Sequence, residues 1–196
     1  MSSKILVDEI APKTTSGIVK GASNVLEVLP MLCDGGSYVV PSGTYTPTNV
    51  TALTNLTTSY VTLPGSEISY TPPSGTICVI YDFTFLYSFS SAHSISHYRF
   101  YSDSDEVTNQ RLNVSGQYPE VIQNLKYVIP IGGSANTATG RQATWTSAKT
   151  LKITVREYGS SNQGTVHSTV YFDGGGAATF HQPSLTITSI GAAYNG

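Results

Sequence analysis

Charged side chains are scarce in this sequence. They make up only 11% of its 196 residues, against roughly 25% in ordinary globular domains. The ten basic and twelve acidic residues nearly cancel and leave a formal net charge of −2. Such a balance gives no electrostatic reason to expect binding to nucleic acid or to an anionic membrane surface. The chain is nonetheless not expected to be disordered, because 39% of it is hydrophobic and β-branched and aromatic residues are abundant.

Long apolar runs and cysteines are also few. No stretch approaches the roughly twenty apolar residues that span a bilayer, so we expect no membrane insertion. The opening MSSKILVDEI has one Lys and a short apolar patch before two acids, which is not the pattern of a secretory signal. We therefore expect a protein that stays in a cytoplasm or leaves it by a route other than secretion. Two cysteines, Cys33 and Cys78, do not form a disulfide scaffold, and Cys78 is predicted to be a small buried hydrophobe.

Motifs that carry catalysis or bind metals are missing. His93 and His97 are four residues apart, but no Glu follows His93, so the HExxH zinc-protease pattern is absent. The acidic turn at 103–106 begins like a calcium loop, yet Val107 stands at a ligand position and no Gly follows. GxGxxG, the phosphate-binding P-loop and the GxSxG nucleophile elbow are absent as well. We predict no enzyme, no cofactor and no metal; a hydrolase with an unrecognised site is the remaining catalytic alternative.

The most distinctive pattern in the chain is a long strand, Thr76–Ser90. Its odd positions, from Ile77 to Phe89, are aliphatic or aromatic without a break, which predicts a strand with one continuous apolar face. At about fifteen residues, this strand is two to three times the usual length. The Ile77–Tyr81 end is apolar on both faces. Its outer side therefore needs a cover, which is either the chain's own N-terminal segment or a neighbouring subunit.

Every other element after about residue 59 also has the pattern of a strand. Gly-, Pro- and Ser-rich turns separate these elements, and several of them alternate between apolar and polar residues. The predicted strands are Ser59–Leu63, Ile68–Thr71, Thr76–Ser90, Ile95–Ser102, Glu106–Leu112, Val121–Ile129, Gln142–Thr146, Thr150–Tyr158, Thr165–Phe172 and Ser184–Ile190. Antiparallel strands in this number, without helices, predict an all-β fold, an antiparallel two-sheet jelly-roll sandwich with a short N-terminal anchoring segment.

The first fifty residues differ from the rest in being mostly turn-rich, with two short apolar runs. A short strand is predicted at Ser37–Val40. Asn24, with Glu27 three residues later, predicts the cap of one helical turn that a following proline would end. We therefore divide the chain into an N-terminal segment and linker, 1–50, to which the resemblance described next gives a role in virion attachment, and a jelly-roll domain, 51–196.

The opening SKILVDEIAPKTTSGIV resembles the N-terminal segment that recurs in structural proteins of marine tailed bacteriophages: a short KI-VD-I strand, a polar turn with Gly, and a second short strand. The remainder is similar to the jelly-roll domains of fibre and spike proteins from such phages. The similarity is carried by GSEISYTPPSGTICVIYDFTF, HSISHYRFYSDSDEV, TGRQATWTSAKTLKITVREY and QPSLTITSI. The chain lacks the coiled-coil or β-helical shaft of a long tail fibre, which favours a short head fibre, a capsid decoration protein or a fibre tip.

The resemblance implies a bacteriophage virion structural protein, commonly a homotrimer, located in the virion after assembly in the host cytoplasm. Its N-terminal segment would attach to other virion proteins while the jelly roll projects. The predicted anchor residues are Ile5, Val7, Ile10 and Ile18. The predicted subunit interface comprises Ile77, Val79, Ile80 and Tyr81, since cyclic oligomers bury apolar patches symmetrically.

The displayed end is predicted to lie at the polar, Gly-rich loops, where Tyr158, Asn162 and Gln163 are the candidate contacts to a host cell-surface glycan. Tyr supplies stacking area, and Asn and Gln amides pair with sugar hydroxyls. Alternatively, these loops only close hairpins. A second class of function also stays open: a carbohydrate-binding, lectin-like β-sandwich module acting through exposed aromatic side chains.

Overall fold

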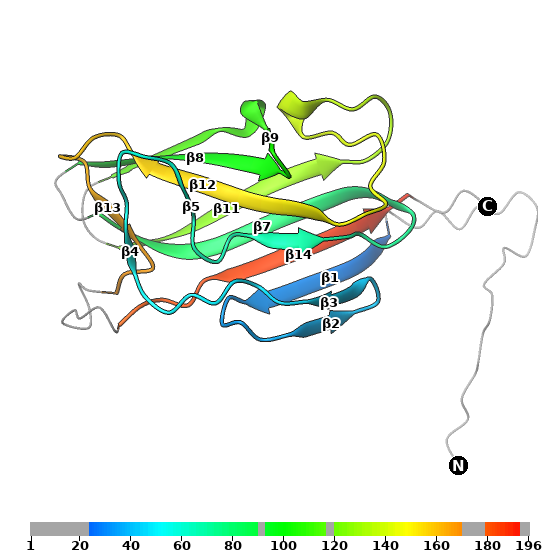
Figure 1. Cartoon of the computed structure of the whole chain (residues 1–196), viewed down its shortest axis with the longest axis horizontal. Coiled ribbons are helices and arrows are strands. Elements are labelled where there is room, and N and C mark those ends of the chain that lie inside the picture. The colour runs from blue at the N-terminus through cyan, green and yellow to red at the C-terminus, as the bar shows by residue number, and fades with distance from the viewer. Residues whose placement is uncertain (1–23, 90–92, 117–119, 170–178, 193–196) are drawn as a thin grey trace, which may run out of the picture.

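A computed structural model of the chain describes residues 24–89, 93–116, 120–169 and 179–192. Two antiparallel β-sheets pack face to face in this part of the chain (Figure 1), which confirms the predicted all-β sandwich. The helical segments described are two short 3-10 turns, η1 (Thr108–Gln110) and η2 (Thr137–Thr139). Within the described ranges, no helix is long and apolar enough to cross a membrane.

The first sheet contains the long strand predicted from the sequence, β7 (Thr76–Phe89), at its centre. One side of β7 pairs with β11 (Val121–Pro130), and the other side pairs with β14 (Ser184–Gly191), which in turn pairs with β1 (Val25–Leu32). Two short strands, β13 (Gly164–Val166) and β4 (Thr54–Asn55), extend the sheet beside the end of β7.

The second sheet has β8 (Ser94–Ser102) and β12 (Lys149–Glu157) at its centre. Outside β8 lie β10 (Leu112–Gly116) and the short β9 (Asp105–Glu106), while β5 (Val61–Thr62) and β6 (Ile68–Tyr70) follow each other along the far edge of β12. A separate hairpin of β2 (Tyr38–Val40) and β3 (Gly43–Tyr45) lies beside β1 (Figure 1).

The pairing shows that the chain is wound as a jelly roll. The short strands β2, β3, β4, β9 and β13 are left out of this count, and β5 and β6 are taken as one interrupted strand. The first strand then pairs with the last, β1 with β14, and the second pairs with the last but one, β5/β6 with β12. Further inward, β7 pairs with β11 and β8 with β10. The chain is therefore one antiparallel ribbon wrapped around a barrel, which is the winding that defines the jelly roll.

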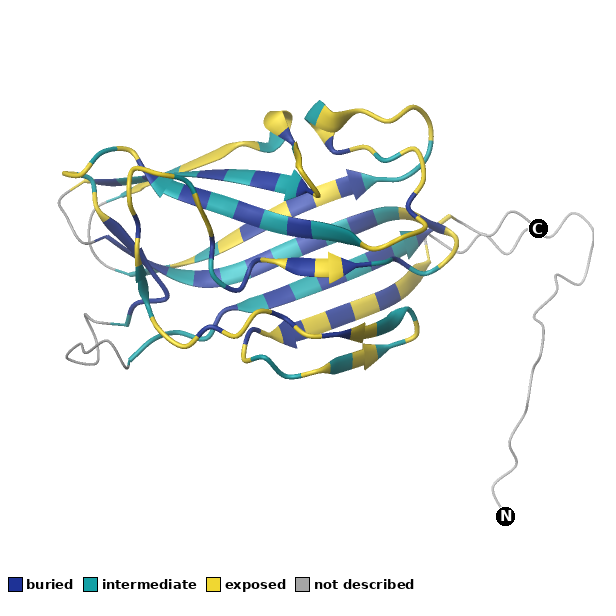
Figure 2. Ribbon diagram, viewed as in Figure 1, coloured by how far each residue is buried: buried dark blue, intermediate teal, exposed yellow. Residues whose placement is uncertain are grey.

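Aromatic side chains fill the space between the two sheets. The odd-numbered side chains of β7 from Val79 to Phe89 point inward, and those from Tyr81 to Tyr87 have no exposed surface. Figure 2 shows the same alternation of buried and partly exposed residues along neighbouring strands. Tyr81 packs on Phe100 of the opposite sheet, with ring centroids 5.2 Å apart. Such pairs add about 0.5–1.5 kcal/mol each beyond their buried area.

Ile77 departs from the unbroken inward stripe predicted for β7. Its side chain is 44% exposed, and Thr76 is buried instead. The cause lies in the neighbouring strand: the register of β14 shifts between Ile190, which pairs with Cys78, and Gly191, which pairs with Thr76. Because of this irregularity, Ile77 has no partner residue in β14, and its side chain points outward instead of inward as the alternation predicts.

The helical turn predicted after Asn24 was wrong, because this stretch is the strand β1. Glu27 does not cap a helix; its carboxylate accepts hydrogen bonds from the Ser42 hydroxyl at 2.7 Å and the Tyr70 hydroxyl at 2.8 Å. Pro30, predicted to end the turn, is tolerated because β1 lies at the edge of the sheet, where a missing N–H costs no ladder hydrogen bond. The residues that we assigned to the linker thus begin the first sheet.

Several strand boundaries also differ from the prediction. Glu106–Leu112 is not one strand: β9 ends at Glu106, η1 follows, and β10 begins at Leu112. Gln142–Thr146 is not a strand either, since Gln142 makes only an isolated bridge to Ile131. The short strand predicted at Ser37–Val40 is present as β2. Part of the predicted strand Thr165–Phe172, residues 170–172, lies outside the described residues.

Candidate functional site

Two of the three predicted glycan contacts, Tyr158 and Gln163, are exposed at the surface, and Asn162 is partly buried. Tyr158 directly follows β12 and is 69% exposed. The Asn162 side-chain amide instead donates a hydrogen bond to the His93 carbonyl at 2.7 Å and so holds its own loop. The backbone carbonyl of Gln163 accepts a hydrogen bond from the Ser94 hydroxyl, while the residue itself is exposed. Tyr158 and Gln163 are therefore the predicted contacts that a partner can reach.

The four predicted interface residues lie on opposite faces of β7. Val79 and Tyr81 are fully buried in the core of this chain, whereas Ile77 and Ile80 face outward. Ile80 is the centre of an outward row that crosses four strands of the first sheet. The members of this row are Val28, Thr188, Ile80 and Val128. The predicted anchor residues, Ile5, Val7, Ile10 and Ile18, lie outside the described residues.

The outward face of the second sheet arranges polar side chains in rows. Where β10, β8 and β12 run side by side, the pairing register places Asn113 opposite His97 and His97 opposite Arg156. In the next row, Ser115 lies opposite Ile95, whose carbonyl accepts a hydrogen bond from the Tyr158 N–H at 2.8 Å. Side chains in such rows stand about 4.5–5.5 Å apart on the same face of a sheet.

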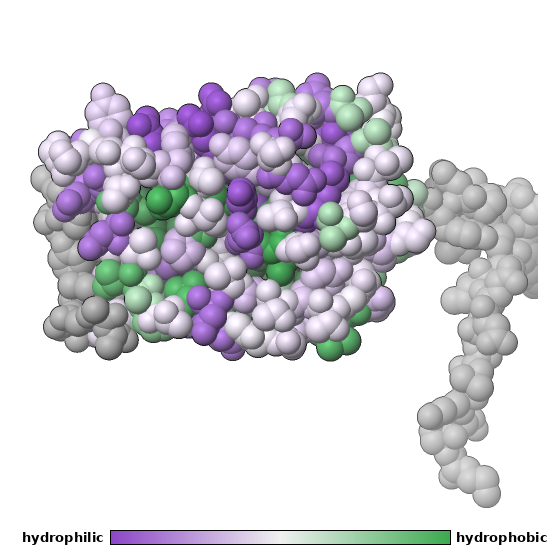
Figure 3. Space-filling model, viewed as in Figure 1, coloured by the Kyte–Doolittle hydropathy of each residue, from purple (hydrophilic) through white to green (hydrophobic). Residues whose placement is uncertain are grey.

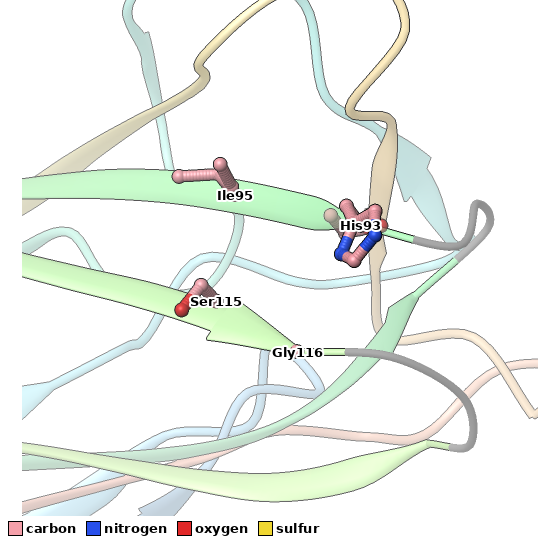
Figure 4. A pocket seen from close by; sticks show the side chains of 5 residues that line it. His93, Ile95, Ser115 and Gly116 are labelled. Atoms are coloured by element: carbon pink, nitrogen blue, oxygen red, sulfur yellow. The ribbon is translucent and has the colours of Figure 1, made fainter.

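These two rows line a shallow groove. A hollow of about 470 Å³ is bounded by six side chains: Ile95, His97, Asn113, Ser115, Arg156 and Tyr158. A second hollow of about 290 Å³ adjoins it, shares Ile95 and Ser115, and reaches His93 and Gly116. Figure 4 shows the second hollow between the first residues of β8 and the last of β10. We call the two hollows together the β8–β10 groove.

Tyr60 fixes the positive side chains beside this groove. The guanidinium carbon of Arg99 lies 4.0 Å from the centre of the Tyr60 ring, and that of Arg156 lies 5.2 Å from it. Arginine in this position is attracted by the negative face of the ring. The Tyr60 hydroxyl is also hydrogen-bonded to His97 Nδ1. One aromatic ring therefore orders two arginines and a histidine, so that these groups are held in place before any ligand arrives.

His97 experiences the positive charge of its neighbours. Burial lowers its pKa below the ordinary value of 6.5, and Arg99, Arg156 and Arg111 lower it further. The neutral imidazole that results can accept the hydrogen bond of the Tyr60 hydroxyl at Nδ1. This cluster was not predicted from the sequence, because Tyr60 is 37 residues away from His97 and nothing local in the sequence pairs them.

One further histidine, His167, lies inside the sandwich, where its backbone N–H donates a hydrogen bond to the Leu86 carbonyl near the end of β7. His167 is fully buried, and its Nε2 lies 3.1 Å from the Pro64 carbonyl. Burial lowers the pKa of His167 from 6.5 to about 4, so it is neutral at physiological pH. No set of three or more His, Cys, Asp or Glu side chains is placed to hold a metal ion among the residues described.

Comparison with known proteins gives weak similarities. No protein-family model and no curated protein matches the sequence. Among solved structures, the chain is similar to those of infectious bursal disease virus, Gt strain, at 9% identity, and Gx strain, at 11% identity, each with a TM-score of 0.35 over 96% of this chain. The D431N mutant VP2 protein of the same virus, in derived T=1 particles, is similar at 10% identity and a TM-score of 0.26 over 81% of the chain. The chain spans 43% of the length of the first two and 42% of the third; these TM-scores are too low to bear on function.

Proposed function

We propose that this chain is a structural protein of a bacteriophage virion, a short head fibre or capsid decoration protein whose jelly roll projects from the particle. The observation that carries the proposal is that the two ends of the sandwich differ: the first and last described strands meet at one end, and the groove lies toward the other. The Gly191 N–H donates to the Asn24 carbonyl at 2.7 Å, so the first and last described strands meet at one end. The β8–β10 groove lies toward the opposite end, where β7 finishes (Figure 1). The fourteen residues of β7 separate these ends by about 45 Å.

This difference between the two ends suits attachment to the particle at one end and display of the groove at the other. Residues 1–23 precede Asn24 and contain the segment that resembles phage virion proteins. Attachment through Ile5, Val7, Ile10 and Ile18 would leave the groove pointing away from the particle. The chain would then reside in the virion after assembly in the host cytoplasm.

The outward face of the first sheet supports the trimeric form of the proposal. Two neighbouring rows on this face are mostly apolar, and their members include Val25, Val28, Cys78, Ile80, Val128, Pro130 and Ile190. Val25, Val28 and Val128 are 59%, 50% and 45% exposed. Apolar side chains gathered in this way mark an interaction surface, and a closed homotrimer would bury them symmetrically.

Cryo-electron microscopy of the parent particle tests the proposal. We expect density for a projecting jelly roll in threefold contact, joined to the particle at the end where β1 begins. Particles carrying a chain that lacks residues 1–20 should lose this density, while the truncated protein remains folded by circular dichroism. Normal incorporation of the truncated chain would contradict the attachment, and absence of the protein from purified particles would contradict the proposal as a whole.

A lectin-like carbohydrate-binding module is the second candidate. The β8–β10 groove favours it, because Tyr158 is exposed beside hydroxyl, amide and guanidinium groups. An array of glycans distinguishes a purely structural protein, which should bind none, from a protein with a recognition role. The two functions are compatible if the protein is both displayed on the particle and engaged with a host surface.

A further inference from the structure

The groove carries positive charge that the described residues leave unpaired. Glu106 forms ion pairs with both Arg99, at 3.4 Å, and Arg111. Arg156 has no ion-pair partner among the described residues, and its Nε is shielded from solvent without a hydrogen-bond partner. The nearest acid along the strand, Glu157, is 3% exposed and points to the interior. The Tyr60 ring beside Arg156 leaves its full charge uncompensated, and a partly desolvated guanidinium without an anionic partner is unfavourable. A bound anion would relieve that cost.

The polar groups around Arg156 are of the kinds that recognise sugars. Asn113 and Ser115 present an amide and a hydroxyl to the same hollow, and Tyr158 presents an exposed ring at its edge. Hydroxyl and amide groups both donate and accept hydrogen bonds, as sugar hydroxyls require. Aromatic rings that are apolar on their faces and polar at one end suit partly wet contact surfaces. Figure 3 shows strongly hydrophilic side chains gathered over the part of the face where Figure 1 places β8, β9 and β12.

We propose that the β8–β10 groove binds an acidic saccharide, with the Arg156 guanidinium on its carboxylate or sulfate group and the Tyr158 ring against a sugar ring. The planar fork of arginine matches such groups with two parallel hydrogen bonds. The two adjoining hollows, of about 470 and 290 Å³, give room for more than one sugar unit. This inference rests on the proposed function in one respect: it names what the displayed end of the protein contacts.

A nucleic acid fits the same groove less well. Binding to a phosphate backbone gains affinity from many cations that follow the strand, whereas Arg99 and Arg111 are already paired with Glu106 here. The chain as a whole has a net charge of −2, which does not attract a polyanion over a long range. A short ligand with one or two negative groups therefore suits the groove better.

Isothermal titration calorimetry on the full chain tests the inference. The probes are a galacturonic acid disaccharide, a monosulfated galactose disaccharide, neutral maltose and a single-stranded DNA trimer, so that each charged probe carries only one or two negative groups. We expect at least one of the acidic saccharides to bind at least tenfold more tightly than maltose, and the two acidic probes to reveal whether carboxylate or sulfate is preferred. Equal binding of all saccharides, no binding of any, or tighter binding of the DNA would each overturn the proposal.

Variants locate the binding within the groove. Arg156→Gln and Tyr158→Ala should each weaken binding of the preferred acidic probe at least tenfold without changing the melting temperature by more than a few degrees. Arg141→Gln is the matched control, because Arg141 is an exposed arginine without an ion pair among the described residues, and its guanidinium donates a hydrogen bond to the Gly132 carbonyl at 3.1 Å. An Arg156→Gln chain that binds as the control does would contradict the assigned site.

The saccharide-binding experiments and the particle experiments can fail independently of each other. If particle density is found and no acidic saccharide binds, the ligand assignment fails and the structural role stands. If the protein is absent from particles but Arg156→Gln abolishes saccharide binding, the groove is confirmed and the virion role fails.

Discussion

Phe100 of β8 and Tyr127 of β11 stack almost face to face across the two sheets, with ring centroids 4.3 Å apart and an angle of 11° between the rings. The pair is buried, and Tyr81 contacts both rings, at 5.2 and 6.2 Å. Contacts of this kind decide how closely the sheets approach. Since β8 and β11 lie in different sheets, the three rings hold the sandwich closed at its centre.

Replacing Phe100 by Ala should therefore destabilise the chain strongly. We expect a loss of about 3–5 kcal/mol in the free energy of unfolding, because a buried ring is removed and a cavity is left. Tyr127→Phe is the matched control: the Tyr127 hydroxyl is buried and has no hydrogen-bond partner among the residues described, so its removal should be neutral or stabilising. Urea unfolding measures both. A large loss from Tyr127→Phe would mean that the hydroxyl has a partner, such as an ordered water.

His167 should make stability depend on pH. Its pKa is about 4 when folded and 6.5 in the ordinary state, so between these values the unfolded chain binds the extra proton. Stability is then full above pH 6.5 and falls as the pH drops towards 4, by about 3 kcal/mol in total for this group. Thermal or urea unfolding at a series of pH values between 4 and 7 records the slope.

The control for this prediction must keep the backbone unstrained. His167 has a φ of 65°, a left-handed conformation that Asn tolerates better than most residues. His167→Asn should therefore fold and show a shallower dependence on pH over the same range, even if its stability at pH 7 is lower. An unchanged slope would assign the dependence to other groups, such as His181, whose pKa burial also lowers.

The apolar rows on the first sheet predict how subunits associate. Val128→Lys places a charge in the row that contains Ile80, and we expect it to convert a trimer into monomers, as measured by light scattering during gel filtration. Val61→Lys is the matched control, because Val61 is a valine of similar exposure, 40% against 45%, on the other sheet. A wild-type chain that elutes with the mass of one subunit would contradict the trimer.

Gly164 allows Tyr87 to approach the backbone closely. A Cβ at this position would overlap the Tyr87 hydroxyl and lie 2.5 Å from the ring carbon that bears it. Tyr87 is fully buried and cannot move away freely, so Gly164→Ala should cost about 1–3 kcal/mol by overpacking. Gly159→Ala is the control, since its Cβ would meet only Asn162 Oδ1, at 3.5 Å. Equal stabilities of the two variants, measured by urea unfolding, would contradict the predicted clash.

Much of the sandwich followed from alternation in the sequence. The long strand β7 and the strands β8, β11, β12 and β14 were predicted to within one or two residues, because each buries one face and so repeats with a period of two. β1 was missed, since Pro30 and the spacing of Asn24 and Glu27 imitate a helix signal. Only its position at the edge of the sheet, a tertiary fact, makes that proline compatible with a strand.

The candidate site could be predicted only in part. Tyr158 was found because an exposed aromatic beside a Gly-rich loop is visible in the sequence. The apposition of Arg156 and His97 depends on the register between β8 and β12, which no local pattern in the sequence specifies. The contact of Tyr60 with both arginines depends on a loop far away in the chain. Alternation predicts which face a side chain joins, and it does not predict which strands become neighbours.

The hydrogen bond between Gly191 and Asn24 has a practical consequence. A label, a fluorescent protein or a surface linker joined directly at Asn24 or Ala192, the two ends of the described sandwich, would leave it from the same end, remote from Tyr158. Sandwiches tethered there through a short linker would present the groove to the solution. A short peptide that links residue 192 to residue 24 would also close the sandwich into a ring, so that new termini opened in a surface loop would give a circular permutant with the same arrangement of strands.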